Sequence, residues 1–204
     1  MLAFRLLLNY FQTLGYDKNY LDSLRYAIPK VSCGIDLKIP SESKIVDSLV
    51  KLEDSPKKYK VIYNLLLDSG LRLVESVTLI NNFKGAEEIN GFFRCELGDF
   101  RGTKRAYYGH FSESTYELIS ELDQKLKVNS SSHYFYKLGF IGPKYLRKFS
   151  FDKMIELEVP ESIADFIQGR VARRVGAKHY MALARQASKY YPRYLGYIEN
   201  LRRG

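Results

Sequence analysis

The sequence predicts a mostly α-helical fold that carries one small three-stranded antiparallel sheet, which is an α+β class. Over most of the chain, apolar residues recur at helical spacing. Between residues 87 and 111 there are instead three short runs rich in aromatic and extended residues, and Asn90-Gly91 between the first two is a strong hairpin signal. With 204 residues, 46% of them hydrophobic, the chain can form one domain with its own core, or one domain and part of another.

Two helices are expected at the beginning of the chain. The first covers Leu2–Leu14, where the apolar periodicity stops at Gly15, and the second covers about Tyr20–Val31. Glycine and proline then mark Ser32–Pro40 as a linker.

Three further helices are expected before the sheet. One begins at Ser41, one covers about Lys58–Asp68 and breaks at Ser69-Gly70, and one resumes over Leu71–Ile80. The three predicted strands are Glu87–Ile89, Phe92–Leu97 and Lys104–Phe111, with a longer turn over Gly98–Thr103.

Helices are expected again after the sheet. Ser114-Thr115-Tyr116-Glu117 matches a capping box that opens a helix to about Leu126. Pro143 suits the first position of a helix over Lys144–Leu157, and Pro160 opens a short helix that ends near Gly169. From Gly176 onward the chain is expected to be helical, with Pro192 breaking or bending it.

The charge of the chain favours a polyanionic partner. Lys and Arg outnumber Asp and Glu by 32 to 23, which gives a net charge of +9. From Gly142 to the C-terminus there are 13 basic against 6 acidic residues, spread over several short elements rather than one amphipathic helix. Nucleic acid is therefore the expected partner, ahead of an anionic membrane surface. The alternative is that the charge only keeps the protein soluble.

The cysteines and histidines predict neither a disulfide scaffold nor a metal site. Cys33 and Cys95 lie in different regions, and the three histidines are too far apart in the sequence for a zinc site. This composition suits a reducing cytoplasm. The first residues lack a basic flank, and Asn9 interrupts their apolar run, so we expect a helix there rather than a signal peptide or a membrane span.

An ordered set of short segments carries the chemistry of the chain: Gly70-Leu71-Arg72-Leu73-Val74-Glu75, Lys104, Lys144-Tyr145-Leu146-Arg147-Lys148, Ile167-Gln168-Gly169-Arg170 and Lys178-His179-Tyr180. In these segments the chain resembles the tyrosine recombinase family, specifically the archaeal integrases of fusellovirus and plasmid type. The resemblance covers about Pro40 to the C-terminus. It implies a tyrosine recombinase catalytic domain over residues 36–204, while residues 1–35 resemble the C-terminal part of the core-binding domain that precedes it.

The resemblance implies that Arg72 and Arg147 bind the scissile phosphate. Arginine suits this task because its planar guanidinium donates two hydrogen bonds to a phosphate and stays charged. The alternative is that Arg72 only forms a surface salt bridge with Glu75, one helical turn further on. The matched Gly-Leu-Arg-x-x-Glu context favours a Glu75 that holds the arginine in place.

By resemblance, the nucleophile is Tyr180, which would form an ester with phosphorus. A phenol has an ordinary pKa of ~10, and clustered cations favour its ionised form. Tyr190 and Tyr191 are the nearest rivals among 17 tyrosines, but they fit the family spacing poorly. Lys104 stands where the family has its general acid, which protonates the leaving 5′ oxygen.

Two positions depart from the wider family but agree with the archaeal group. Lys144 stands where many members have histidine, and it could accept the proton of the tyrosine if its pKa were depressed. Arg170 stands where they have histidine or tryptophan, and its expected task is to donate hydrogen bonds to the phosphate.

Six basic residues are expected to contact the DNA: Arg101, Arg105, Lys148, Arg173, Arg174 and Lys178. Further basic residues toward the C-terminus are expected to extend a surface that binds the DNA backbone: Arg185, Lys189, Arg193, Arg202 and Arg203. For each of these residues from Arg173 onward, a solvated helix face is an equal alternative. Arg101 and Arg105 also rival Lys104 as the contact to the DNA groove.

The resemblance implies a metal- and ATP-independent integrase that acts as four protomers on double-stranded DNA, with the tail to Gly204 able to dock onto a neighbouring subunit. Two alternatives stay open. One is a type IB topoisomerase-like enzyme that relaxes DNA, and the other is a non-catalytic DNA-binding protein of recombinase descent.

Overall fold

The computed structural model describes residues 2–28, 34, 36–101, 104–170 and 182–203. For residues 2, 98–101, 104 and 105 it describes the backbone only. The internal contacts divide the chain into two compact units, Met1–Leu37 and Lys38–Gly204, each of which is considered by itself.

The first unit is a hairpin of two helices, α1 (Leu2–Thr13) and α2 (Lys18–Ala27). Asp17 caps α2, because its carboxylate accepts a hydrogen bond from the Tyr20 backbone N–H at 2.8 Å. The described helix α2 ends at Ala27, four residues before the predicted end. Three buried residues form the core of this unit: Leu8, Leu21 and Ile28. Large apolar side chains remain exposed on it: Phe4, Leu6, Leu7, Tyr10, Leu14, Tyr16, Tyr20 and Tyr26.

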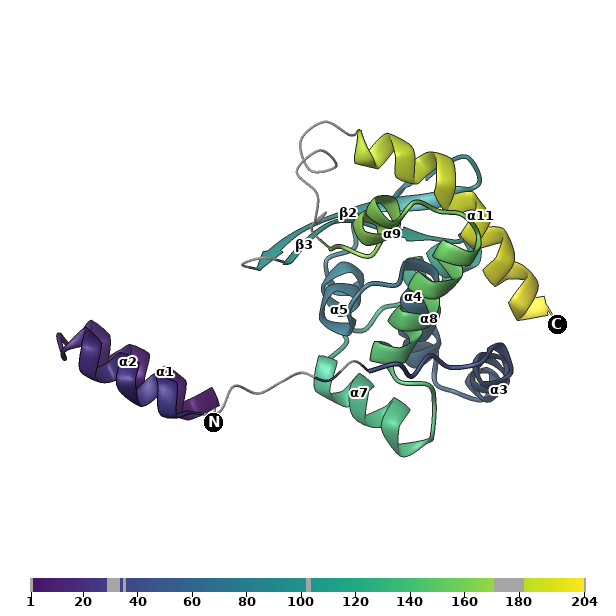
Figure 1. Cartoon of the computed structure of the whole chain (residues 1–204). Coiled ribbons are helices and arrows are strands. Elements are labelled where there is room, and N and C mark those ends of the chain that lie inside the picture. The colour runs from purple at the N-terminus through teal and green to yellow at the C-terminus, as the bar shows by residue number, and fades with distance from the viewer. Residues whose placement is uncertain (1, 29–33, 35, 102–103, 171–181, 204) are drawn as a thin grey trace. The chain divides into compact units, whose positions relative to one another are not determined.

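The second unit is mostly helical with one small sheet, so the predicted fold class is confirmed (Figure 1). Its helices are α3 (Glu42–Glu53), α4 (Lys57–Ser69), α5 (Leu73–Asn81), α6 (Glu113–Ser120), α7 (Val128–Lys137), α8 (Pro143–Glu156), α9 (Glu161–Ile167) and α11 (Leu183–Arg203). Helix α4 is the most buried, and it packs against α8, α5, α6 and the sheet.

Three antiparallel strands form the sheet in the order β1-β2-β3: β1 (Glu87–Ile89), β2 (Phe92–Arg101) and β3 (Lys104–Phe111). Asn90 and Gly91 both have positive φ, 51° and 81°, which is the two-residue turn predicted from the sequence. The prediction that β2 stops at Leu97 is wrong. The strand continues to Arg101, because an irregularity in the register between Glu96 and Asp99 accommodates the residues around Gly98.

Helices cover both faces of the sheet. Gly109 of β3 lies against Leu71 and Leu79, next to and within α5, and the lack of a side chain allows this close packing. On the other face, Ala106 lies against Gly169 after α9, and the His110 ring lies 5.3 Å from the ring of Tyr191 on α11. The sheet is therefore held between α4 and α5 on one side and α9 and α11 on the other (Figure 1).

Three details of the helices differ from the predictions. Ser112 rather than Ser114 caps α6, accepting from the Thr115 N–H at 3.3 Å, and that helix ends at Ser120. Helix α7 was not predicted, because its serine-rich start has a low helix propensity. Of the two outcomes expected at Pro192, a break is ruled out, because α11 continues through it, and five buried residues offset the cost of proline, ~3 kcal/mol.

None of the helices in the described part of the chain combines the length and the apolar character that crossing a bilayer requires.

Candidate active site

Three arginines from separate segments converge in the second unit. Arg72 is the N-cap of α5, Arg147 lies in α8 and Arg170 follows α9. Arg72 and Arg147 both form an ion pair with Glu75, and the charges of Arg72 and Arg170 both act on Arg147. The structure therefore brings together four of the predicted site residues.

Glu75 holds Arg72 at two points. As the third residue of α5, it accepts a hydrogen bond from the Arg72 backbone N–H at 2.8 Å and another from the Arg72 guanidinium. The same guanidinium nitrogen also donates to the Gly169 carbonyl at 3.2 Å. Glu75 is buried, so this pair is not the surface salt bridge that the sequence left open. The Arg72 side chain remains 30% exposed, which leaves it accessible to a ligand.

Arg147 is buried between two backbone carbonyls. Its Nη1 donates to Gly70 O at 2.7 Å and to Gln168 O at 2.6 Å. Its Nη2 is also buried, and it has no hydrogen-bond partner among the described residues. A buried donor without a partner costs free energy, and an anion bound at this point would satisfy it.

Burial, followed by the charges of Arg72 and Arg170, lowers the pKa of Arg147 to about 9, while the neighbouring carboxylates act in the opposite direction. The guanidinium is therefore still charged at neutral pH. Three arginines face two buried carboxylates, Glu75 and Asp165, so the cluster keeps an excess of positive charge.

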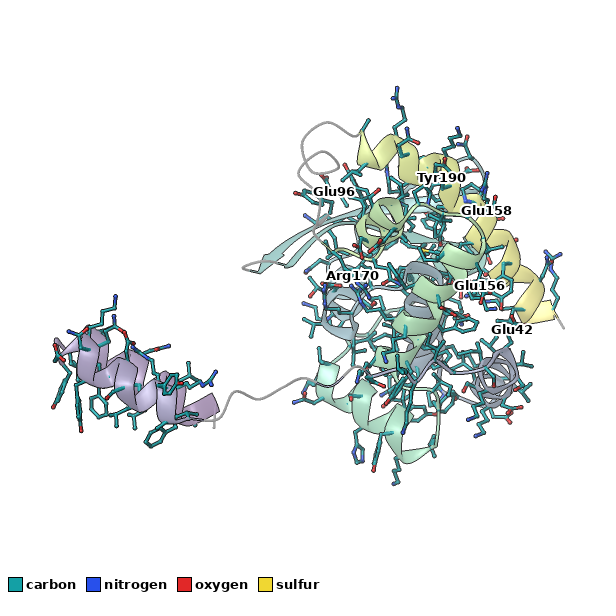
Figure 2. All side chains as sticks on the ribbon, in the orientation of Figure 1. Glu42, Glu96, Glu156, Glu158, Arg170 and Tyr190 are labelled. Atoms are coloured by element: carbon teal, nitrogen blue, oxygen red, sulfur yellow. The ribbon has the colours of Figure 1, made fainter. Side chains whose placement is uncertain are left out.

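Arg170 is oriented by the turn that follows α9. Its backbone N–H donates to Asp165 O at 2.7 Å, and its guanidinium lies 3.4 Å from the Asp165 carboxylate. The guanidinium also lies over the ring of Phe151, 4.6 Å from the centroid. Figure 2 labels Arg170 in the second unit, and its side chain is 31% exposed.

Gly169 brings strand β3 to the arginines. It has φ of +68°, and a Cβ at this position would lie 2.7 Å from the Cβ of Ala106, so only glycine fits without strain. Ala106 lies two residues after Lys104, the first residue of β3, which corresponds to ~7 Å along a strand. The backbone of Lys104 therefore lies ~7 Å along the strand from the contact between Ala106 and Gly169.

Of the other predicted site residues, the structure describes Lys144 and Lys148 in full. Lys144 is exposed in the first turn of α8, one turn before Arg147, and Lys148 donates to Lys38 O at 3.2 Å. The side chains of Arg101, Lys104 and Arg105 are outside the description, and so are Arg173, Arg174, Lys178 and Tyr180 altogether.

Sequence reasoning missed two buried polar residues beside the arginines, Asp165 and Gln168. Asp165 lies within the apolar run of α9, and Gln168 is the C-cap that follows this run, so both side chains are buried with their apolar neighbours. An acidic residue between Ala164 and Phe166 was a signal that could have found the first of them.

Helix α11 packs on the core of its own unit. The Tyr194 hydroxyl donates to Leu67 O at 2.6 Å, the Tyr191 hydroxyl donates to Asp68 O at 3.1 Å, and Arg202 pairs with the Asp68 carboxylate. These contacts fix Leu183–Arg203 on the core of the same chain.

The rival tyrosines do not belong to the arginine cluster. Burial raises the pKa of Tyr191 well above its ordinary value, which disfavours a phenolate. Tyr190 lies on α11, where the Arg193 guanidinium lies 5.1 Å from the centroid of its ring (Figure 2). In the described part of the chain, the Tyr191 hydroxyl binds the backbone of α4 and the Tyr190 ring packs against Arg193 on its own helix, so both tyrosines have packing roles there.

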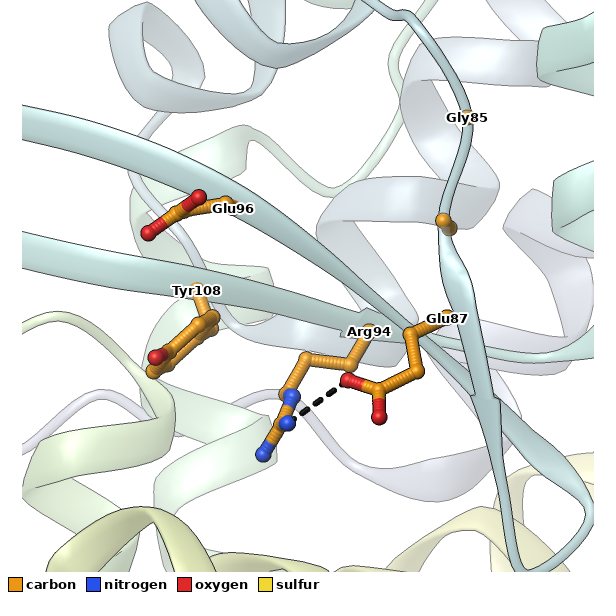
Figure 3. Close-up of a pocket in the computed structure, with 6 residues that line it drawn as sticks. Gly85, Glu87, Arg94, Glu96 and Tyr108 are labelled. Atoms are coloured by element: carbon orange, nitrogen blue, oxygen red, sulfur yellow. Dashed lines mark hydrogen bonds and ion pairs between the residues drawn. The ribbon is translucent and has the colours of Figure 1, made fainter.

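A pocket of about 350 Å³ lies beside the sheet (Figure 3). Its lining residues are Gly85, Ala86, Glu87, Arg94, Glu96 and Tyr108. Arg94 donates to Glu87 at 2.7 Å and lies over the Tyr108 ring, 4.7 Å from the centroid. Arg94 is thus paired within the pocket, and the described residues that line the pocket do not include those of the arginine cluster.

One comparison identifies relatives of this chain. A family model described as archaeal phage integrase matches residues 37–197, a span that includes Arg72, Glu75, Arg147 and Arg170. No curated protein matches the chain.

Proposed function

The chain belongs to the archaeal phage integrase family, and from this we propose that it is a tyrosine recombinase that cuts and rejoins double-stranded DNA. An integrase acts on DNA, and the excess of basic residues agrees with such a partner. The observation that carries the proposal is the buried Nη2 of Arg147, which lacks a partner among the described residues and lies in a cluster with two more guanidiniums.

The arginine cluster suits the phosphate of a phosphodiester. As a nucleophile attacks phosphorus, negative charge develops on the two non-bridging oxygens, and fixed donors stabilise that charge best. Arg72, Arg147 and Arg170 would donate to these oxygens. Buried Glu75 and Asp165 hold two of the three in place, so little reorganisation is needed.

Tyr180 would be the nucleophile and Lys104 the general acid. The phenol oxygen forms a bond to phosphorus, the bond from phosphorus to the 5′ oxygen breaks, and that oxygen takes a proton from Lys104. Lys144, in its neutral form, would accept the proton of the Tyr180 phenol. Rejoining is the reverse reaction, in which a 5′ hydroxyl attacks the phosphotyrosine ester. Because the ester conserves the energy of the original bond, the reaction needs no ATP.

We further propose the wider setting that the family resemblance implies. The enzyme would integrate a mobile element into a host chromosome, with four protomers assembled on two duplexes. Residues 1–35 would be the end of a core-binding domain, and residues 36–204 the catalytic domain. The basic residues Arg101, Arg105, Lys148, Arg173, Arg174 and Lys178 would bind the DNA backbone.

A covalent adduct tests the proposal. Purified protein is incubated in EDTA with a pool of nicked duplexes of randomised sequence, in which the leaving strand diffuses away after cleavage. We expect a protein–DNA adduct that resists SDS, is absent with Tyr180→Phe and is strongly reduced with Arg147→Lys. Binding without any adduct would favour the non-catalytic alternative.

A second assay separates an integrase from a topoisomerase-like enzyme. Duplexes recovered from the adducts are placed on two plasmids, one of them supercoiled. Exchange between the plasmids supports the integrase, whereas relaxation without exchange would contradict it.

A further inference from the structure

Gln168 is a fully buried polar residue at the centre of the arginine cluster, and the proposed reaction does not use it. Its side chain is 0% exposed, at the end of α9. Its neighbour Gly169 accepts a hydrogen bond from Arg72, and the residue after that is Arg170. A buried amide at this junction can affect all three arginines.

Gln168 and Arg147 hold each other reciprocally. The Arg147 Nη1 donates to the Gln168 backbone carbonyl at 2.6 Å, and the Gln168 Nε2 donates back to the Arg147 backbone carbonyl at 2.9 Å. Both the backbone and the guanidinium of Arg147 are thus fixed by the same residue. Since Nη1 also donates to Gly70 O, the nitrogen left for a ligand is Nη2.

The amide of Gln168 also packs tightly against the turn that leads to Arg72. A Cβ at Gly70 would lie 2.5 Å from Gln168 Nε2 and 3.0 Å from both Cγ and Cδ. Gly70 has a φ of +60° as well, so this position requires glycine for two reasons. The side chain of Gln168 therefore has little room to move. Its Oε1 makes no hydrogen bond to the described residues, so the donor half of the amide does the holding.

We propose that Gln168 is a positioning residue for the DNA cleavage reaction. Its amide fixes Arg147 so that Nη2 is presented to a non-bridging oxygen of the scissile phosphate. The inference rests on the proposed function and adds to it a residue that touches neither the DNA nor the reacting atoms. Gln168 would act through Arg147, whose positive charge stabilises the negative charge on the phosphate.

Two substitutions remove the donor of the amide. Gln168→Glu keeps the shape and turns an acceptor toward the Arg147 carbonyl, and Gln168→Met keeps the approximate length without any hydrogen bond. The matched control is Asn81→Asp. The Asn81 amide also holds a backbone reciprocally, donating to Leu126 O at 3.0 Å and accepting from Leu126 N at 2.8 Å. It contacts none of the three arginines in these bonds.

The experiment measures the single-turnover rate of adduct formation at saturating DNA, together with DNA affinity and thermal unfolding. The substrates carry either an ordinary scissile phosphate or a methylphosphonate, which lacks one of the two non-bridging oxygens. We expect both Gln168 variants to form the adduct ~10–100-fold more slowly on the ordinary phosphate, since a misplacement of about 1 Å costs ~100-fold. DNA affinity should stay within about 2-fold, because one misplaced guanidinium removes at most one phosphate contact.

The methylphosphonate is the readout that a merely structural role would not change. With less charge to stabilise, the defect should shrink to about 3-fold or less on this substrate. Asn81→Asp should match the wild type on both substrates.

The remaining outcomes distinguish a wrong proposed function from a wrong role for Gln168. If the wild type forms no adduct, the proposed function is wrong and this inference falls with it. If the wild type forms the adduct and Gln168→Met equals it in rate, or is slowed equally on both substrates, the inference alone is overturned. Gln168→Met decides the question if the charged variant does not fold.

Discussion

The buried ion pair between Arg202 and Asp68 predicts a large loss of stability when Arg202 is removed. Asp68 is 0% exposed at the end of α4, and its Oδ1 pairs with Arg202 at 2.5 Å. Its Oδ2 accepts from the backbone N–H of Ser112 at 3.0 Å and from the hydroxyls of Ser112 and Thr115, both at 2.7 Å. Arg202→Leu therefore leaves a buried carboxylate with donors on one oxygen only.

The expected loss in the free energy of unfolding depends on the hydrogen bonds that Asp68 keeps. Removing one partner of a buried ion pair costs ~3–5 kcal/mol, and the three remaining donors to Oδ2 place Arg202→Leu near the lower end, at ~3 kcal/mol. For a unit of this size, each kcal/mol lowers the melting temperature by ~2–4 °C, so a decrease of ~10 °C is expected.

The partner substitution should cost less. In Asp68→Asn the unpaired cation is Arg202, which lies in the last turn of α11 and can reach water, so we expect ~1–2 kcal/mol. The double variant should be no less stable than Arg202→Leu, which would show a coupling of at least ~1–2 kcal/mol between the two side chains.

Urea unfolding followed by circular dichroism measures these values, with the exposed neighbour Arg203→Leu as the control. If Arg202→Leu lies within about 1 kcal/mol of the wild type, or if Asp68→Asn is the more destabilising change, the buried pair does not stabilise α11 as described.

Three further predictions concern the site and the core. Glu75→Gln should slow adduct formation on nicked DNA ~10–100-fold, because a neutral amide holds the Arg72 guanidinium more weakly, and an unchanged rate would contradict the role of Glu75. Gly169→Ala should lower the free energy of unfolding in urea by ~2–4 kcal/mol, because its Cβ would overlap Ala106, whereas Gly139→Ala, with a similar φ of +66° and open space, should cost ~1 kcal/mol. Burial lowers the pKa of His110 to about 3, below its ordinary 6.5. The unfolded chain therefore binds more protons at this residue, and stability should fall by ~1.4 kcal/mol per pH unit between pH 6 and pH 4. The slope of urea unfolding free energy against pH should be smaller by this amount in His110→Phe, and equal slopes would refute the assignment.

The sequence predicted those features that depend on local pattern. Helical periodicity and the Asn90-Gly91 turn were enough for the fold class, and the spacing of Arg72 and Glu75 was enough for their pairing, since residues three apart are neighbours on a helix.

The features that depend on distant segments could not be predicted in this way. Ser114 has a glutamate three residues later and matched the capping box better, yet Ser112 is the cap because Asp68, from α4, accepts both its N–H and its hydroxyl. Likewise, nothing near Gln168 in the sequence shows that its amide meets Gly70, almost a hundred residues earlier.

The two carbonyls that hold Arg147 have an electrostatic consequence. Gly70 and Gln168 are the C-caps of α4 and α9, so the guanidinium sits where the negative ends of two helix dipoles meet. Each such end carries at most about half an elementary charge, and less for a helix as short as α9. Two helix ends can therefore hold a cation in the interior while neutralising only part of its charge. A hydrogen-bonded carboxylate in the same place would neutralise all of it. What remains of the charge of Arg147 is available to whichever anion enters.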